Sequence, residues 1–246
     1  MRFKLLEYEN NHETEILTDI QVKKMLETTH KEADRPWAAI YRGVNIGPEN
    51  LSYLVTPNPA NPRMSANTYN YYTLIINNAH AWKEFPKREI ICTTNENSAW
   101  GFGDVYRVFP QNGAKIGICP RTDIWLSDFD SGAHILDNLF RVFKVKSLGP
   151  DRDYRQFVKA CSVVDENKKV ILRNDRDGRP YFASIDREKL KQYVNGNVDL
   201  IDYIQQEFFN PGSGGFRAED IRLFSTDNRD HEVWTDAPCL LIPYND

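Results

Sequence analysis

The stretch REIICTTNENSAWGFGDVYRVFP, residues 88 to 110, carries the clearest structural pattern in this sequence. It opens with a β-branched apolar run that ends in Thr93 and Thr94. A short polar and aromatic insert follows, and a second run then alternates between apolar and polar residues. This order predicts a strand, a tight helical turn and a second strand. Because a buried hydroxyl needs a hydrogen-bond partner, the two threonines are either paired internally or used by a ligand.

The composition is that of an ordinary globular protein. The chain has 246 residues, of which 41% are hydrophobic and 27% charged, and its formal net charge is -4. This length allows one large domain or two small ones, and the charge disfavours broad attraction to nucleic acid or to an anionic membrane. The sequence has no apolar run near the ~20 residues that span a bilayer. Its N-terminal segment turns acidic too early for a signal peptide. We therefore expect a cytoplasmic protein.

Cysteines and histidines show no spacing typical of a metal site. The four cysteines lack a C-x-x-C pair, and three of them lie in apolar runs. We interpret them as buried free thiols in a reducing compartment. The five histidines are scattered without metal-ligand spacing, so we expect no metal.

Upstream of the central stretch, two places carry arginines that need anionic partners. Arg42 follows a strand predicted over residues 37 to 41. There it either forms an internal salt bridge or clamps a phosphate or carboxylate of a ligand. Arg63 and Asn67 lie at the start of a helix predicted over residues 65 to 82. A helix N-terminus beside an arginine is a favourable anion site.

Elsewhere, short strands alternate irregularly with helices, which indicates mixed α and β structure. Beyond the central stretch, the sequence predicts strands at residues 3–8, 51–56, 115–119 and 239–242, a polar turn up to residue 15, and helices that begin at Thr18-Asp19 and at about Ser131. From residue 147 the chain is more charged, with amphipathic helices and a hairpin at Asp177-Gly178. We expect one domain over residues 1–246, with 147–227 as a helical insertion or subdomain.

Glu232 opens the last apolar part of the chain, ahead of the strand predicted at 239–242. An acidic residue that enters a core strand is costly to bury unless its carboxylate faces a cleft. Together with Arg42 and with Thr93-Thr94, it forms a set of three strand-associated polar positions in the order Arg, Thr-Thr, Glu.

This set resembles the mono-ADP-ribosyltransferase superfamily, in the branch with an Arg, Ser/Thr, Glu signature. The matching motifs are the aromatic-Arg pair Tyr41-Arg42, the strand end IICTT and the glutamate that opens a late strand. The segment with Ala99 and Phe102-Gly103 that leads into YRVFP is similar to phage and bacterial members. The resemblance covers roughly residues 36–125 and 228–243 of this chain and leaves 147–227 unexplained.

The resemblance implies an α+β fold, with a pair of small, mostly antiparallel sheets that form a cleft and helices outside them. It implies cleavage of NAD, release of nicotinamide and transfer of ADP-ribose to a macromolecular acceptor. Glu232 would stabilise the oxocarbenium-like transition state, through the ribose 2′-hydroxyl. Thr93 would contact the ribose or nicotinamide, and Thr94 would help to hold Glu232 in place.

Further residues take binding roles by the same resemblance. Arg42 would bind the pyrophosphate or the adenosine-side ribose, and the backbone of Gly43 would approach the nicotinamide amide. Trp100, Phe102 or Tyr106 would stack on the nicotinamide ring. Arg63 and Asn67 would complete the anion site.

The chain also departs from the family pattern. Cys92 replaces the first hydroxyl of the second motif, and Asp230 stands where arginine-specific members carry a second glutamate. The acceptor therefore stays open between a protein side chain, a nucleic-acid base and water. Two other functions remain: an NAD glycohydrolase, and a non-catalytic module in which Arg42 and Glu232 form a structural ion pair and residues 147–227 bind protein or nucleic acid. The likeness to phage members associates the protein with a bacterial host cytoplasm.

Overall fold

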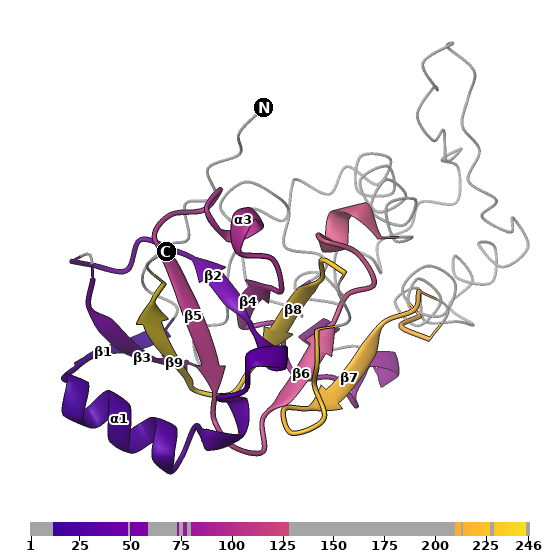
Figure 1. The fold of residues 1–246 in the computed structure, drawn as a ribbon. Helices are drawn as coiled ribbons and strands as arrows, with labels where there is room; N and C mark the ends of the chain where they lie inside the picture. The colour runs from indigo at the N-terminus through magenta and orange to yellow at the C-terminus, as the bar shows by residue number, and fades with distance from the viewer. Residues whose placement is uncertain are drawn as a thin grey trace, which may run out of the picture.

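A computed structural model describes residues 12–48, 50–58, 73, 76–77, 80–127, 210–212, 214–226 and 229–244. Within these residues the chain forms one nine-stranded sheet, in the order β1-β3-β9-β5-β2-β4-β8-β6-β7 (Figure 1), and every strand pairing is antiparallel. The strands are β1 His12–Leu17, β2 Tyr41–Gly43, β3 Ser52–Pro57, β4 Ile90–Thr93, β5 Val105–Pro110, β6 Lys115–Ile118, β7 Arg217–Asp220, β8 Glu232–Thr235 and β9 Cys239–Pro243. The antiparallel character is as expected, but the pairing joins all nine strands into one sheet rather than two.

Helices are few and short in the described part of the chain. The α-helices are α1 Asp19–Glu27 and α3 Glu96–Ala99, and the 3-10 helices are η2 Lys31–Ala33, η3 Pro36–Ala38, η4 His80–Trp82 and η5 Ile124–Leu126. The predicted start of α1 is confirmed: Thr18 and Gln21 form a capping box that satisfies amide groups of the first turn. In Figure 1, α1 runs along the lower edge of β1, β3 and β9.

The central stretch folds as predicted. Residues of β4 lead into the single turn of α3, and β5 follows. The side chain of Asn95 caps α3, because its carbonyl oxygen accepts from the Ser98 amide at 3.2 Å. The predicted strands at 51–56, 115–119 and 239–242 correspond to β3, β6 and β9.

Three expectations were wrong within the described residues. The strand predicted over residues 37–41 begins only at Tyr41, because Pro36 starts the 3-10 turn η3. The segment expected as a polar turn is β1, an edge strand that buries only Leu17 and so lacks an apolar alternation. β7 lies inside the range expected to be helical. The strand at 3–8, the helix from Ser131, the hairpin at Asp177-Gly178 and the other helices of 147–209 lie outside the described residues.

The core lies along the middle of the sheet. β9, the last strand in sequence, lies between β3 and β5, and its Leu240 and Leu241 are completely buried. Figure 1 shows how the yellow C-terminal strand lies between the indigo strand β3 and the magenta strand β5. β9 therefore joins β1 and β3 to the rest of the sheet.

A second buried cluster covers one face of β8. Trp234 packs against the rings of Trp82, Phe85 and Phe216, with centroids 6.4, 6.3 and 6.3 Å away. Gly117 on the neighbouring strand β6 makes this possible, because a Cβ atom there would overlap the Trp234 indole. The cluster binds the segment around residues 80–89 to the sheet.

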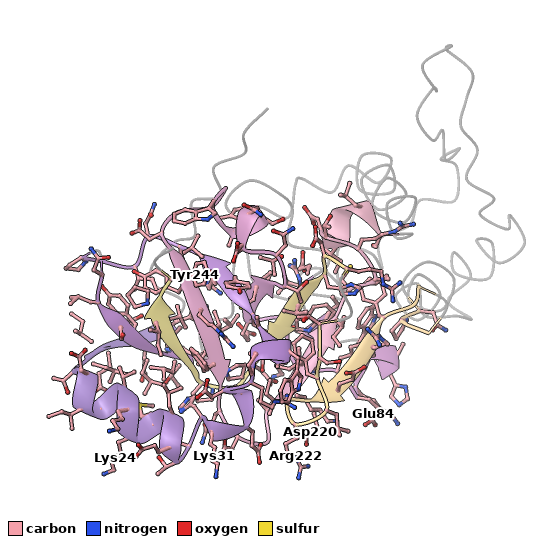
Figure 2. All side chains as sticks on the ribbon, viewed as in Figure 1. Lys24, Lys31, Glu84, Asp220, Arg222 and Tyr244 are labelled. Atoms are coloured by element: carbon pink, nitrogen blue, oxygen red, sulfur yellow. The ribbon has the colours of Figure 1, made fainter. Side chains whose placement is uncertain are left out.

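The far edge of the sheet ends in an exposed ion pair. Arg222 donates to both carboxylate oxygens of Asp220, at 2.9 and 2.7 Å. This hydrogen bonding lowers the pKa of the Asp220 carboxyl to about 2. Figure 2 shows the two side chains together at the end of β7. Across the described residues, the structure has no helix that is long and apolar enough to cross a membrane.

Candidate active site

The three motif strands lie side by side in the middle of the sheet. β2, β4 and β8, which carry Arg42, Thr93 and Glu232, are consecutive neighbours. Thr93 is paired with Glu232 across β4 and β8 and with Tyr41 across β2 and β4. Because directly opposed residues of antiparallel strands share a face, Thr93 and Glu232 project to the same side of the sheet.

The Glu232 carboxylate is buried and held by three donors. The side chains of Glu232 and of its ion-pair partner Arg88 are each 8% exposed. Arg88 donates to Oε1 through Nε at 3.1 Å and through Nη2 at 2.7 Å. The backbone amide of Ile124 donates to Oε2 at 3.1 Å. The charge of this carboxylate is therefore compensated inside the protein, as a buried charge requires.

Arg88 is itself fixed by a second layer of polar groups. Its Nη1 donates to the hydroxyl of Thr73 at 3.1 Å, and its backbone amide donates to Oδ1 of Asn77 at 2.6 Å. Asn77 in turn donates to Glu89 at 3.1 Å. The guanidinium is thus held from two sides, which fixes the direction in which it meets Glu232.

The two threonines have different partners. The hydroxyl oxygen of Thr93 accepts from the Asn95 amide at 3.1 Å, and no acceptor for its hydrogen is found among the described residues. The Thr94 hydroxyl accepts from the His231 amide at 2.9 Å and donates to the Arg229 carbonyl at 3.1 Å. Thr94 therefore holds the backbone immediately before Glu232.

Asp230 lies at the exposed end of this arrangement. The side-chain amide of Asn95 donates to its Oδ2 at 2.6 Å. Since the same asparagine caps α3, it links the turn after β4 to the segment before β8. The carboxylate of Asp230 keeps a second oxygen that can accept a hydrogen bond from a molecule outside.

Arg42 leaves the sheet on the opposite face from Thr93 and Glu232. It follows Tyr41, which pairs with Thr93, and successive residues of a strand alternate between faces. Its Nη1 donates to the Ile91 carbonyl at 3.2 Å. The expected Arg42–Glu232 ion pair of the non-catalytic alternative is therefore wrong, because Arg88 occupies that position.

On the face of Thr93, Tyr41 packs its ring edge-on against Tyr244, with centroids 5.1 Å apart. Tyr244 is labelled beside β5 in Figure 2. Among the proposed stacking residues, Trp100 and Phe102 are exposed, by 51% and 41%. Tyr106 is 1% exposed and packs in the core against Tyr53, so stacking of its ring on a nicotinamide is excluded.

Gly43 fits closely against α3. A Cβ atom at this position would overlap the carbonyl oxygen of Ala99. The glycine therefore brings the turn after β4 against β2, and it does so whether or not its backbone also meets a ligand. Arg63 and Asn67 lie outside the described residues.

The thiols near this arrangement are unsuited to nucleophilic catalysis. Burial and the neighbouring charge of Glu232 raise the pKa of the Cys119 thiol to about 12. Burial also raises the pKa of Cys239 well above its usual range. Since the thiolate is the reactive form, both remain inert at neutral pH. The described residues also contain no group of three or more His, Cys, Asp or Glu that could hold a metal ion.

The sequence interpretation missed Arg88 and Asn95. Arg88 stands two residues before the buried strand β4, and Glu232 is the first residue of the buried strand β8, so the argument used for the glutamate applied to the arginine as well. Asn95 is a typical N-cap residue ahead of α3. Its contact with Asp230 had no signal in the sequence, because 135 positions separate the two residues.

Comparison with known proteins found no matching family model, no matching curated protein and no matching solved structure. The resemblance to ADP-ribosyltransferases therefore rests on the motif residues alone.

Proposed function

We propose that this protein cleaves NAD and transfers its ADP-ribose to a macromolecular acceptor. The observation that supports this most is the direct pairing of Thr93 with Glu232 on neighbouring strands, beside the strand of Arg42. A hydroxyl and a carboxylate on one face of a sheet are the groups that such a reaction needs around a ribose.

The hydrogen-bonding capacity of the pair suits a ribose hydroxyl. Oε1 of Glu232 accepts two bonds from Arg88, which occupies both lone pairs. Oε2 accepts one bond from Ile124 and keeps one acceptor position. Thr93 keeps its hydroxyl hydrogen as a donor. In the proposal the ribose 2′-hydroxyl donates to Oε2, and Thr93 donates to a second oxygen of the nucleotide.

The reaction breaks the bond between the ribose C1′ and the nicotinamide nitrogen. The electron pair leaves with nicotinamide, and the ribose develops positive charge in the transition state. The fixed negative charge of Glu232 stabilises that charge, with little reorganisation because Arg88 and Ile124 already hold it. A nucleophile of the acceptor then bonds to C1′ and loses its proton.

Other residues complete the proposal. Trp100 and Phe102 offer exposed rings for stacking, and Asp230 offers an exposed carboxylate that would orient the acceptor. Arg63 and Asn67 would bind the anionic part of NAD, whereas Arg42, which is buried and projects from the opposite face of the sheet, would take no part in that contact. In this proposal the protein is an α+β domain whose sheet bounds a nucleotide cleft, and it acts in the cytoplasm.

Release of nicotinamide from NAD labelled in that ring tests the proposal. The purified protein is supplied with protein, DNA and RNA acceptors, and a second label in the adenine reports transfer. We expect release by the wild type and a loss of about 100-fold or more in Glu232→Gln, because the fixed negative charge is gone while the shape is kept. Glu219→Gln, a change on β7, is the matched control and should retain activity.

Absence of nicotinamide release with every acceptor would overturn the proposal. Release without transfer of the adenine label would identify an NAD glycohydrolase instead. Equal activity of Glu232→Gln and wild type would contradict the role of the carboxylate.

A further inference from the structure

Arg88 is the group through which the protein controls Glu232. It is buried, it does not belong to the Arg, Ser/Thr, Glu signature, and it meets the carboxylate with two of its nitrogens on one oxygen. Rotation of the carboxylate about its last bond is restricted, because Arg88 holds Oε1 while the Ile124 amide holds Oε2.

The contacts of the ion pair are arranged asymmetrically. Both of these guanidinium donors go to Oε1, whereas among the described residues Oε2 accepts from the Ile124 amide alone. The free acceptor position is therefore on Oε2, the oxygen that Arg88 does not contact. An ion pair that served stability alone would gain more from a fork in which each nitrogen binds its own oxygen.

The second layer keeps this asymmetry in place. Thr73 accepts from Nη1, on the side of the guanidinium away from the glutamate contact. Asn77 holds the backbone of Arg88, and Glu89 holds the Asn77 amide. Groups at Thr73 and Asn77 thus hold Arg88, and Arg88 in turn determines the orientation of the carboxylate.

We propose that Arg88 is the positioning residue of the reaction: it fixes the Glu232 carboxylate so that Oε2 points its free acceptor position at the ribose. This inference rests on the proposed function. Thr73 acts indirectly, because its hydroxyl holds the Arg88 guanidinium in place.

The test compares Arg88→Lys, Arg88→Gln and Thr73→Val with the wild type in nicotinamide release, each corrected for the folded fraction. Lysine keeps the charge but offers Oε1 one nitrogen in place of the two that Arg88 uses. We therefore expect kcat to fall about 10-fold in Arg88→Lys and about 100-fold in Arg88→Gln. KM for NAD should stay within about threefold, because Arg88 does not contact the substrate in this proposal. Thr73→Val should lower kcat by a smaller factor, about 3-fold, since the ion pair remains.

The split between kcat and KM separates positioning from packing. A residue that only packs should leave both values unchanged per folded molecule, whereas a positioning residue should lower kcat alone. Arg35→Gln is the structural control: this arginine donates to the carbonyls of Ile221, Arg222 and Phe224, and its loss should leave kcat per folded molecule unchanged.

The results test the proposed function and the role of Arg88 separately. Wild-type protein that releases no nicotinamide overturns the proposed function and this inference together. Active wild type, with Arg88 and Thr73 variants whose kcat per folded molecule is unchanged, overturns this inference alone. If Arg88→Gln does not fold, Arg88→Lys and Thr73→Val give the same decision, since both keep the charge of the pair.

Discussion

At Gly43 the chain has no room for a side chain. Its Cα faces the Ala99 carbonyl so closely that a methyl group would overlap the carbonyl oxygen. Because this oxygen belongs to the backbone, it cannot rotate away as a side chain could. The turn after β4 would have to move away from β2. In the proposed site this displacement would disturb the cap that Asn95 forms on α3 and the hydrogen bond from Asn95 to Asp230.

We expect Gly43→Ala to lower the free energy of unfolding by about 2 kcal/mol, as overpacking of a well-packed interior does. Urea denaturation followed by tryptophan fluorescence measures the change. Gly101→Ala is the matched control, because a Cβ atom there meets only the Ser98 carbonyl, at 3.4 Å. A loss in Gly43→Ala no larger than in Gly101→Ala would mean that α3 can shift without cost.

At the scale of elements, one hydroxyl joins the end of β4 to the segment before β8. The Thr94 amide donates to the His231 carbonyl at 3.0 Å, and the Thr94 hydroxyl accepts from the His231 amide and donates to the Arg229 carbonyl. These bonds set where β8 begins, and with it the place of Glu232 opposite Thr93.

Thr94→Val removes the hydroxyl and keeps the shape. We expect a loss of about 1–2 kcal/mol in the free energy of unfolding, because the partly buried His231 amide loses its acceptor. Hydrogen exchange of that amide should become faster, and nicotinamide release should fall with it. Thr14→Val, an exposed change on β1, should stay within about 0.5 kcal/mol of the wild type. Unchanged hydrogen exchange at His231 would show that the Thr94 hydroxyl does not protect this amide.

At the scale of the whole molecule, α1 and the turn after it are docked onto the β5–β6 turn. The amide and side chain of Asn112 donate to the carbonyls of Thr29 and Thr28 at 2.8 and 2.6 Å. His30 lies beneath this contact, 2% exposed, with Nδ1 within 2.9 Å of the Thr29 hydroxyl. Its Nε2 has no hydrogen-bond partner in the described part of the chain.

Burial lowers the pKa of His30 from 6.5 to about 4. Between these values the unfolded chain binds a proton that the folded protein excludes, so stability is lost as the pH falls from 6.5 toward 4. We expect His30 to account for about 1–2 kcal/mol of the loss in unfolding free energy between pH 7 and pH 5. Urea denaturation at the two pH values measures it.

The comparison needs a variant at each of two histidines. His30→Gln should flatten this pH dependence even if it lowers stability at pH 7. His80→Gln changes an exposed histidine and should keep the wild-type dependence. The same slope in His30→Gln and wild type would show that another group causes the acid sensitivity.

Much of the local structure could be predicted, since local signals are short-range. Thr18 and Gln21 mark the start of α1, and the β-branched run before Thr93 marks β4. β1 could not be predicted, because it is an edge strand that buries one side chain and shows no alternation. Two sheets were expected where one is found, because strand pairing depends on partners that no local pattern reveals.

The candidate site divides in the same way. The sequence by itself determined which strands carry Thr93 and Glu232 and that a buried carboxylate needs a partner. Only the tertiary structure decided that this partner is Arg88 rather than Arg42. Pairing register sets the face from which a strand residue projects, and Arg42 falls on the face opposite Glu232. Register and burial are set by residues more than one hundred positions apart, beyond the reach of any local pattern.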